Sequence, residues 1–188
     1  MADDGVIDGG DFRIRPWRDS DAPSLQRHAD DARVSQGLSD RFPFPYTLDD
    51  ARQFLASAAS QPDRAMAIEI DGVAVGGIGQ EAGVDVHALR TQIGYWLGVA
   101  FWNRGLMRRI VPLWVDHLFD THPHYQRIQA LVYANNPASA RVLALSGFHC
   151  EGVQRCAAIK RGVILDTTTW ARLRDDSRPA PTKDAHHD

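Results

Sequence analysis

The chain has 188 residues, a mass of 20.9 kDa and a hydrophobic fraction of 44%, which predict one globular domain and exclude a disordered chain. Its 21 Lys and Arg against 24 Asp and Glu give a formal charge of −3 and a pI near 6.2, so a basic nucleic-acid-binding protein is excluded. No apolar run reaches the roughly 18 residues of a membrane span, and the first residues lack the pattern of a signal peptide. We therefore expect a cytoplasmic protein with no nucleic-acid or membrane partner.

Both ends of the chain read as tails around a single domain. Residues 1–11 hold four Asp and no Lys or Arg, and the chain after Arg174 is polar with two prolines. Such composition is typical of poorly ordered termini. We expect flexible tails over residues 1–10 and 175–188 and one domain over residues 11–174.

The first part of the domain alternates a strand with two helices. Phe12–Arg15 alternates apolar and basic residues, which predicts a strand. Asp19 or Ser20 can then cap a helix that runs through His28. The Phe-Pro-Phe-Pro run at 42–45 is incompatible with a regular helix or a central strand, and Thr47 can cap the next helix.

The middle of the domain reads as a hairpin, a strand and a long helix. Asp71-Gly72 separates the β-rich runs Ala65–Ile70 and Val73–Gln80, which is the pattern of a type I′ hairpin. Thr91–Val99 predicts a third central strand, and Leu106–Phe119 has helical periodicity.

The last part adds three strands and a short helix. Ile128–Tyr133 is β-rich, Asn136-Pro137 opens a helix that ends near Gly147, and Phe148–Ala157 with Val163–Leu173 forms a closing strand pair. The order β-α-α-β-β-β-α-β-α-β-β combines antiparallel hairpins with a parallel crossover. It therefore predicts an α+β fold with a mixed sheet.

The two cysteines, Cys150 and Cys156, do not form a recognisable site. If Phe148–Ala157 is a regular strand they lie on one face about 20 Å apart, too far for a disulfide. Neither has the spacing of a metal site. We expect two buried thiols and no metal.

The segment that enters the long helix can bind a phosphate group. A strand ends near Leu97, a loop with Arg104 and Gly105 follows, and the helix begins with Arg108 and Arg109 in its first turns. Free amides and positive charge at a helix N-terminus suit an anion. The alternative is an ordinary strand-to-helix turn with a solvated basic face.

The second segment of interest begins at Asn136. Asn before Pro137 is a strong N-cap, which alone explains Asn136, and Ser139 follows in the first helical turn.

Taken together, these marks resemble the GNAT superfamily, and more closely its RimJ/RimL-like branch of N-acetyltransferases. The matching segments span nearly the whole core: Arg13–Pro16, Ile93–Leu97, Phe101–Gly105, Asn136–Leu143, Gly147-Phe148, Glu151-Gly152, and Lys160–Gly162 followed by Asp166. The resemblance implies a mixed, mainly antiparallel sheet whose fourth and fifth strands splay apart. It also implies that acetyl-CoA, the co-substrate, lies in this V.

The resemblance assigns cofactor roles residue by residue. Backbone groups of Leu97, Gly98 and Val99 would pair with the pantetheine arm, Asn136 would contact the cofactor, and Ser139 would lie near the thioester sulfur. The pyrophosphate would be held by the loop of Trp102, Asn103, Arg104, Gly105, Leu106 and Met107. The chain departs from the family pattern Gln/Arg-x-x-Gly-x-Gly/Ala at Trp102 and Met107, and Asn103 replaces a common glycine. We expect CoA binding to be retained with altered affinity.

For catalysis, the resemblance implies Ser139 as a donor to the leaving thiolate, and we expect Glu81 as the first candidate base. Family members often have Glu where this chain has Gln92, and many have a Tyr acid where it has Leu143. Asp85 and His87 are further candidate bases near Glu81. We expect direct attack of a neutral primary amine on the thioester in a ternary complex, with a backbone amide near Leu97 or Val99 stabilising the oxyanion.

Three alternatives stay open. Gln92, Leu143 and Met107 are also compatible with a catalytically weak CoA-binding sensor or interaction module. Another donor such as succinyl-CoA would need a cation near the acyl end, for which Arg90 is a candidate. The protein would be a monomer, or a homodimer that pairs through Val163–Leu173 as an edge strand.

We expect the acceptor to be a protein N-terminus or a small-molecule amine. Phe42, Phe44 and Tyr46 either line the acceptor mouth or form a hydrophobic staple for the helix that Thr47 caps.

Overall fold

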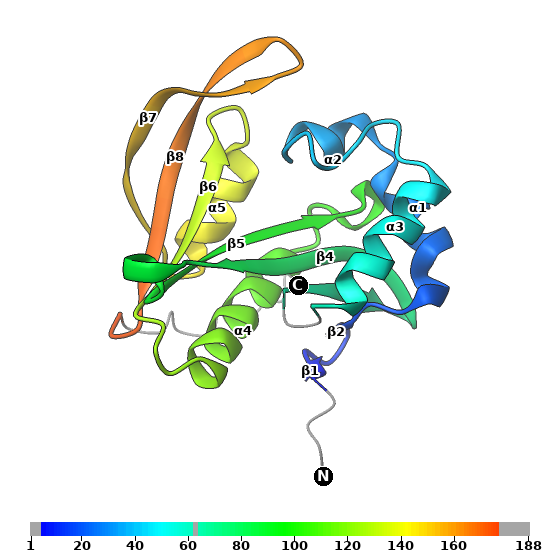
Figure 1. Cartoon of the computed structure of the whole chain (residues 1–188), viewed down its shortest axis with the longest axis horizontal. Helices are drawn as coiled ribbons and strands as arrows, with labels where there is room; N and C mark the ends of the chain where they lie inside the picture. The colour runs from blue at the N-terminus through cyan, green and yellow to red at the C-terminus, as the bar shows by residue number, and fades with distance from the viewer. Residues whose placement is uncertain (1–4, 62–63, 177–188) are drawn as a thin grey trace, which may run out of the picture.

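The computed structural model describes residues 5–61 and 64–176 (Figure 1). Its strands are β1 (Ile7–Asp8), β2 (Arg13–Pro16), β3 (Ala65–Ile70), β4 (Val73–Ala82), β5 (Arg90–Leu97), β6 (Arg127–Tyr133), β7 (His149–Lys160) and β8 (Val163–Leu173). Its α-helices are α1 (Ala22–Ala29), α2 (Ala32–Gln36), α3 (Leu48–Ala59), α4 (Leu106–Thr121) and α5 (Pro137–Leu145). Three short 3₁₀ turns accompany them: η1 (Asp19–Asp21), η2 (Asp85–His87) and η3 (Val99–Phe101).

The strands form one eight-stranded sheet in the order β1-β2-β3-β4-β5-β6-β8-β7. Every neighbouring pair is antiparallel except β5 and β6, which are parallel and connected through α4. The predicted α+β fold with a mixed, mainly antiparallel sheet is confirmed.

Local signals in the sequence explain several element boundaries. Asp71 and Gly72 both have positive φ, 50° and 78°, as a type I′ turn between β3 and β4 requires. Thr47 caps α3 through its hydroxyl, which accepts from the Asp50 amide, while the Asp50 carboxylate accepts from the Thr47 amide. This reciprocal capping box fixes the start of α3.

The helices cover both faces of the sheet (Figure 1). On one face, α4 and α5 pack over the strands in a cluster that includes Ile14, Ile78 and Trp114. On the other, α1 and α3 enclose a smaller cluster around Leu25 and Leu55. We call these the α4/α5 face and the α1/α3 face.

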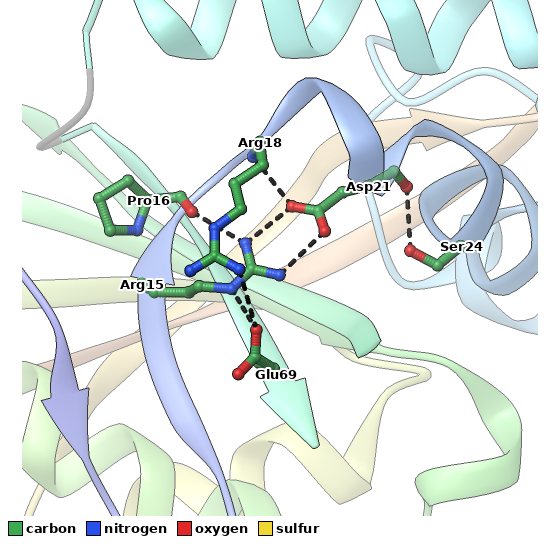
Figure 2. A network of polar contacts seen from close by, with 6 residues as sticks. All are labelled: Arg15, Pro16, Arg18, Asp21, Ser24 and Glu69. Atoms are coloured by element: carbon green, nitrogen blue, oxygen red, sulfur yellow. Dashed lines mark hydrogen bonds and ion pairs between the residues drawn. The ribbon is translucent and has the colours of Figure 1, made fainter. Parts of the chain in front are cut away.

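A buried ion network joins β2, η1 and β3 (Figure 2). The Arg15 guanidinium donates to both oxygens of Asp21, at 2.7 and 2.9 Å, and to Glu69 on β3. Arg15 is only 2% exposed, and Arg18 approaches Glu69 from the solvent side at 3.8 Å. Because each of the three buried charged groups has a partner, the network fixes the entry to α1 against the sheet.

Some boundaries differ from the sequence prediction. Asp19 and Ser20 lie inside a 3₁₀ turn, so α1 begins later than predicted, at Ala22. Ile7–Asp8, within the segment predicted as a tail, pairs with β2. Residues 177–188 of the predicted C-terminal tail lie outside the described residues.

The prediction of buried cysteines is wrong, because both thiols are exposed. Cys150 and Cys156 lie on β7, which is the edge of the sheet, and its register with β8 shifts near both residues. The suggestion that Val163–Leu173 is an edge strand is also wrong, since β8 lies between β6 and β7. None of the helices in the described part of the chain is long and apolar enough to cross a membrane.

Candidate active site

The sheet opens between β5 and β6. The two strands pair only where Arg90, Thr91 and Gln92 face Arg127, Ile128 and Gln129, and they diverge beyond this point (Figure 1). The Gln129 side-chain amide donates to the Gln92 side-chain oxygen at 3.3 Å and closes the narrow end. Counted without the short β1, these are the fourth and fifth strands, so the predicted V is present.

The predicted pyrophosphate loop leads directly into α4. Asn103 and Gly105 both have left-handed backbones, with φ of 59° and 69°, and Gly105 is the N-cap of α4 without a side-chain cap. In the described part of the chain, no group accepts a hydrogen bond from the amides of residues 103–107. Free amides at the positive end of a sixteen-residue helix fit a polyanion.

The three arginines near this loop have different surroundings. The Arg108 Nε is buried without a hydrogen-bond partner among the described residues, and Arg104 lies 5.2 Å over the Phe101 ring. Arg109 instead binds Asp11 at 2.6 Å and the Gly9 carbonyl at 2.9 Å, and so ties α4 to the N-terminal segment. Arg104 and Arg108, rather than all three, are therefore the cations with capacity for an anion here.

Backbone groups at the end of β5 are partly used within the fold. The Trp102 indole donates to the Leu97 carbonyl at 2.8 Å, and the Gly98 amide donates to the Val75 carbonyl at 2.8 Å. The Val99 amide has no acceptor in the described chain. Gly98 and Val75 form the hydrogen-bonded pair here, so the Leu97 amide, opposite Gly76, points away from β4. Of the three residues predicted to face the pantetheine arm, Leu97 and Val99 thus keep amides directed away from β4, whereas the Gly98 amide is used within the sheet.

The ring of His28 explains the glycine at position 98. A Cβ at Gly98 would lie 2.7 Å from the His28 ring, which also contacts Phe101 edge-on at 5.5 Å. Burial lowers the pKa of His28, with the Arg27 charge acting in the same direction. The imidazole therefore packs against the end of β5 as a neutral ring at pH 7.

Asn136 caps α5 and also lies close to Gly37. Its side-chain oxygen accepts from the Ser139 amide at 3.2 Å, which makes it the N-cap of α5 as predicted. Its amide nitrogen lies 3.1 Å from the point where a Cβ would stand on Gly37, just after α2. Asn136 thus lies where the α5 N-terminus meets the segment that follows α2.

Tyr95 is a site residue that the sequence analysis missed. Its hydroxyl lies 2.8 Å from Ser139 Oγ and 3.3 Å from the Ser139 carbonyl, and so joins β5 to α5. Burial raises the pKa of Tyr95 to about 12, although the hydrogen bond with Ser139 acts in the opposite direction. Leu143, at the position where the family often has a tyrosine, is completely buried. The available signal was the strand period, because Tyr95 places a hydroxyl on the face shared with Ile93 and Leu97.

A cavity of about 740 Å³ lies on the α1/α3 face, and we call it the α3 cavity. It is lined by Arg41, Phe42, Pro43, Tyr46, Asp50, Gln53, Phe54, Ser57, Ala58, Gln61, Arg64, Ala65, Gly79, Gln80, Glu81, Gln92, Ile93 and Gly94. Glu81 stands opposite Gln92 in the β4–β5 register, and Gly79 stands opposite Gly94. A Cβ on Gly94 would meet nothing within 4 Å, so there is open space in the cavity above Gly94.

Glu81 is the only one of the three candidate bases that lines the α3 cavity. It also approaches Arg64 at 3.5 Å, and 60% of its side chain is exposed. Asp85 and His87 lie on the exposed turn η2 between β4 and β5, outside the residues that line the cavity. The geometry therefore favours Glu81.

The aromatic residues before α3 take two roles. Phe42 and Tyr46 line the α3 cavity with ring centroids 4.8 Å apart, and Phe42 also contacts Trp96. Tyr46 is buried with Ala51 in the same cluster, as a hydrophobic staple across the capped start of α3 would require. Phe44 lies outside the cavity lining and contacts the Arg161 guanidinium at 5.0 Å. No group of three or more His, Cys, Asp or Glu gathers within residues 5–61 and 64–176.

Comparison with known proteins identifies the family of this chain. A family model for the GNAT acetyltransferase domain matches residues 11–149. The chain belongs to the GNAT family. This GNAT chain is similar to the probable N-acetyltransferase YjcK of Bacillus subtilis (strain 168), with 40% identity over 90 residues, or 47% of this chain and 49% of YjcK. It spans about half the length of the curated relatives that it matches.

Solved structures with the same fold include two complexes with coenzyme A or its acetyl form. RimL, a ribosomal-protein α-N-acetyltransferase bound to coenzyme A, gives a TM-score of 0.79 at 21% identity, over 89% of this chain and 97% of RimL. The microcin C7 self-immunity acetyltransferase MccE, bound to acetyl-CoA and AMP, gives 0.75 at 19% identity, over 87% of this chain and 93% of MccE. At these identities the likeness concerns the GNAT fold, and the predicted resemblance to the family is confirmed.

Proposed function

We propose that this GNAT chain transfers the acetyl group of acetyl-CoA to a primary amine. One observation carries the proposal: the V between β5 and β6 has different chemistry on its two faces. The free amides before α4 and the Tyr95–Ser139 pair lie on the α4/α5 face. The α3 cavity, with Glu81 and Gln92, lies on the α1/α3 face. A thioester and an amine entering from opposite faces would meet in the V.

The donor would be held mainly by backbone. The amides from Asn103 to Met107 would bind the pyrophosphate, with Arg104 and Arg108 adding positive charge. Supporting this fit, those amides have no acceptor within the described chain, and the Arg108 Nε is a buried donor without a partner. The Val99 amide would pair with the pantetheine arm. The Leu97 carbonyl already accepts a hydrogen bond from the Trp102 indole. Asn136 and Ser139 at the start of α5 would contact the acyl end.

The chemical step is direct acyl transfer. The neutral amine nitrogen attacks the thioester carbonyl carbon, a C–N bond forms, the C–S bond breaks, and the electron pair leaves on sulfur. The Leu97 amide, which points away from β4, stabilises the oxyanion, and Ser139 Oγ–H donates to the leaving thiolate. The proton that the nitrogen loses passes to Glu81, the carboxylate on the floor of the α3 cavity.

The acceptor class follows from the cost of deprotonating the amine. At pH 7.4 a lysine-like amine is about one-thousandth neutral, a cost of roughly 4 kcal/mol, whereas an α-amine costs about 1 kcal/mol. Gln92 provides no base, and Glu81 is largely exposed and close to Arg64. We therefore propose a protein N-terminus or a weakly basic small-molecule amine. If log(kcat/KM) rose with unit slope up to about pH 10, the acceptor would be a strongly basic amine and this assignment would be wrong.

Thiol release from acetyl-CoA tests the proposal. The full chain is incubated with panels of N-terminal peptides, polyamines, amino acids and aminoglycosides, and acetylated product is identified by mass. We expect release that depends on acceptor and is fastest with a peptide N-terminus or another weakly basic amine. Acetyl-CoA binding without release for any acceptor would contradict the proposal and favour the sensor alternative. Faster thiol release from succinyl-CoA than from acetyl-CoA would identify succinyl-CoA, rather than acetyl-CoA, as the donor.

A further inference from the structure

We propose that Tyr95 is a positioning residue for acyl transfer: its hydroxyl donates to Ser139 Oγ and leaves the serine O–H directed at the thioester sulfur. The inference rests on the proposed function in one respect, that the sulfur lies beside Ser139. Nothing in the sequence pattern of α5 indicates a partner for this serine, because the partner comes from β5, 44 residues away.

The backbone of Ser139 is fixed before the hydroxyl contact is made. Ser139 is the third residue of α5, and its amide donates to the Asn136 cap at 3.2 Å. Its hydroxyl has one partner among the described residues, Tyr95, at 2.8 Å. A serine hydroxyl rotates freely unless a partner holds it, so Tyr95 determines where the Ser139 proton points.

The separation of the two hydroxyls allows either one to donate, and we assign the donor role to Tyr95 because the Ser139 proton is then available to the sulfur. The 2.8 Å separation from Ser139 Oγ is the usual O–H···O length, and the Ser139 carbonyl, at 3.3 Å, is a second and more distant acceptor for the Tyr95 hydroxyl. When the Tyr95 hydroxyl donates a hydrogen bond to Ser139 Oγ, the serine can donate its own proton to a second acceptor. A hydroxyl that accepts one hydrogen bond is also a stronger donor in the next.

The acidity of the phenol shows that Tyr95 does not supply the proton itself. With a pKa of about 12, Tyr95 keeps its proton across the working range. An ordinary thiol has a pKa near 8.5, so proton transfer from Tyr95 to the thiolate would be uphill by about 3.5 pKa units. The thiolate therefore leaves hydrogen-bonded to Ser139, and Tyr95 remains protonated throughout.

Tyr95 lies in the V, on the face where the thioester is proposed to bind. β5 has no β6 partner beyond Gln92, so Tyr95 lies where the walls of the V have separated. Its ring packs against the cluster on the α4/α5 face, which orients the hydroxyl towards the first turn of α5. The pair thus lies on the face assigned to the thioester, opposite the α3 cavity.

Kinetics of Tyr95→Phe, Ser139→Ala and the double variant test the coupling. We expect Tyr95→Phe to lower kcat about tenfold, with the KM for acetyl-CoA changed less than about twofold. Adding Tyr95→Phe to Ser139→Ala should cause no further loss, because Tyr95 acts through Ser139. The matched control is Tyr125→Phe, another buried tyrosine of the same cluster, which should leave kcat unchanged. Additive losses in the double variant would overturn the proposal.

A binding measurement separates this inference from the proposed function. If the pair stabilises a thiolate, bound CoA has a thiol pKa below 8.5, so its Kd should fall as the pH rises from about 7 towards 8.5. Titration calorimetry should show this fall for the full chain and a flatter dependence for Tyr95→Phe. Equal pH dependence in the two proteins would overturn the role of Tyr95. Absence of turnover with every amine would overturn the proposed function, yet leave this binding result interpretable.

Discussion

At the scale of single residues, the site depends on where hydroxyl and carboxyl groups lie relative to the V. Leu143 occupies the family's tyrosine position, but Tyr95 brings a hydroxyl to Ser139 from the opposite wall. Gln92 occupies the family's glutamate position, but Glu81 stands directly opposite it on β4. The hydroxyl that α5 lacks at Leu143 is thus present on β5, and the carboxylate that β5 lacks at Gln92 is present on β4.

Exchange of the carboxylate between Glu81 and Gln92 tests this arrangement. Glu81→Gln should lower kcat/KM at neutral pH by about a hundredfold, a typical contribution of a general base. Gln92→Glu in the same chain should restore most of the loss, because the two positions face each other across the β4–β5 ladder. Initial rates of thiol release measure both effects. If Glu81→Gln left the rate unchanged, the amine would lose its proton to solvent instead.

The two glycines of the cavity floor make a matched pair of substitutions. Gly94→Ala adds a methyl group to open space in the α3 cavity, so we expect a higher KM for the amine, a constant KM for acetyl-CoA and unchanged stability. Gly79→Ala would place its Cβ 2.4 Å from the Arg64 carbonyl and should lower the melting temperature. An unchanged amine KM in Gly94→Ala, measured with saturating acetyl-CoA, would show that the acceptor binds elsewhere.

The sequence predicted those features of the site that depend on residues close together in the chain. The Asn136 cap, the Gly105 helix entry and the position of Ser139 follow from neighbouring residues and were predicted. Tyr95 was not, because its partner lies 44 residues away. The surroundings of Arg109 were missed for the same reason, since Asp11 lies 98 residues from it. Contacts of this kind become visible only when the strand order is known.

At the scale of elements, strong local signals placed the helices and strands, and weak ones did not. The Asp71-Gly72 turn and the Thr47 capping box specified their elements closely. The five-residue α2 was missed because a segment this short shows no periodicity. Distant contacts hold the segment around it, since Arg161 donates to Ser35 and Lys160 binds Asp40 at 2.6 Å.

Asn136 tests whether a helix cap also binds the cofactor. Asn136→Ala should cost about 1 kcal/mol of stability through loss of the α5 cap and should also weaken acetyl-CoA binding. Asn136→Asp keeps a capping oxygen but loses the side-chain N–H donors, so it should restore stability without restoring affinity. The control is Thr47→Ala, which removes the α3 cap at a similar cost and should leave the KM for acetyl-CoA unchanged. Full affinity in Asn136→Asp would assign Asn136 to capping alone.

At the scale of the whole molecule, the buried Arg15 network determines how α1 and the sheet hold together. Burial lowers the pKa of Arg15, but hydrogen bonds to Asp21 and Glu69 outweigh this and raise it. Arg15→Met would leave both carboxylates buried without their main partner, and we expect a loss of about 3–5 kcal/mol in urea unfolding. Arg33→Met breaks an exposed pair with Asp31 and should leave the urea midpoint almost unchanged, because solvent screens exposed ion pairs. Equal losses would show that burial of the network is irrelevant to stability.

Alkaline unfolding provides a second measurement at this scale. Burial raises the pKa of Tyr46 and of Tyr95 to about 12, from an ordinary value of 10.0. A raised folded-state pKa contributes stability that is complete below pH 10 and is lost as the pH rises towards 12. We expect the free energy of unfolding to fall over this interval, and to fall less steeply in Tyr46→Phe and Tyr95→Phe. An identical slope in both variants would show that neither phenol is buried in solution.

The central claim is that the acetyl group passes directly from acetyl-CoA on one face of the sheet to an amine on the other. Initial rates measured while both substrates are varied test it most directly, combined with the intact mass of the protein after incubation with acetyl-CoA alone. Direct transfer in a ternary complex predicts intersecting double-reciprocal lines and an unmodified protein. Parallel lines together with a stoichiometrically acetylated, chemically competent protein would contradict the account.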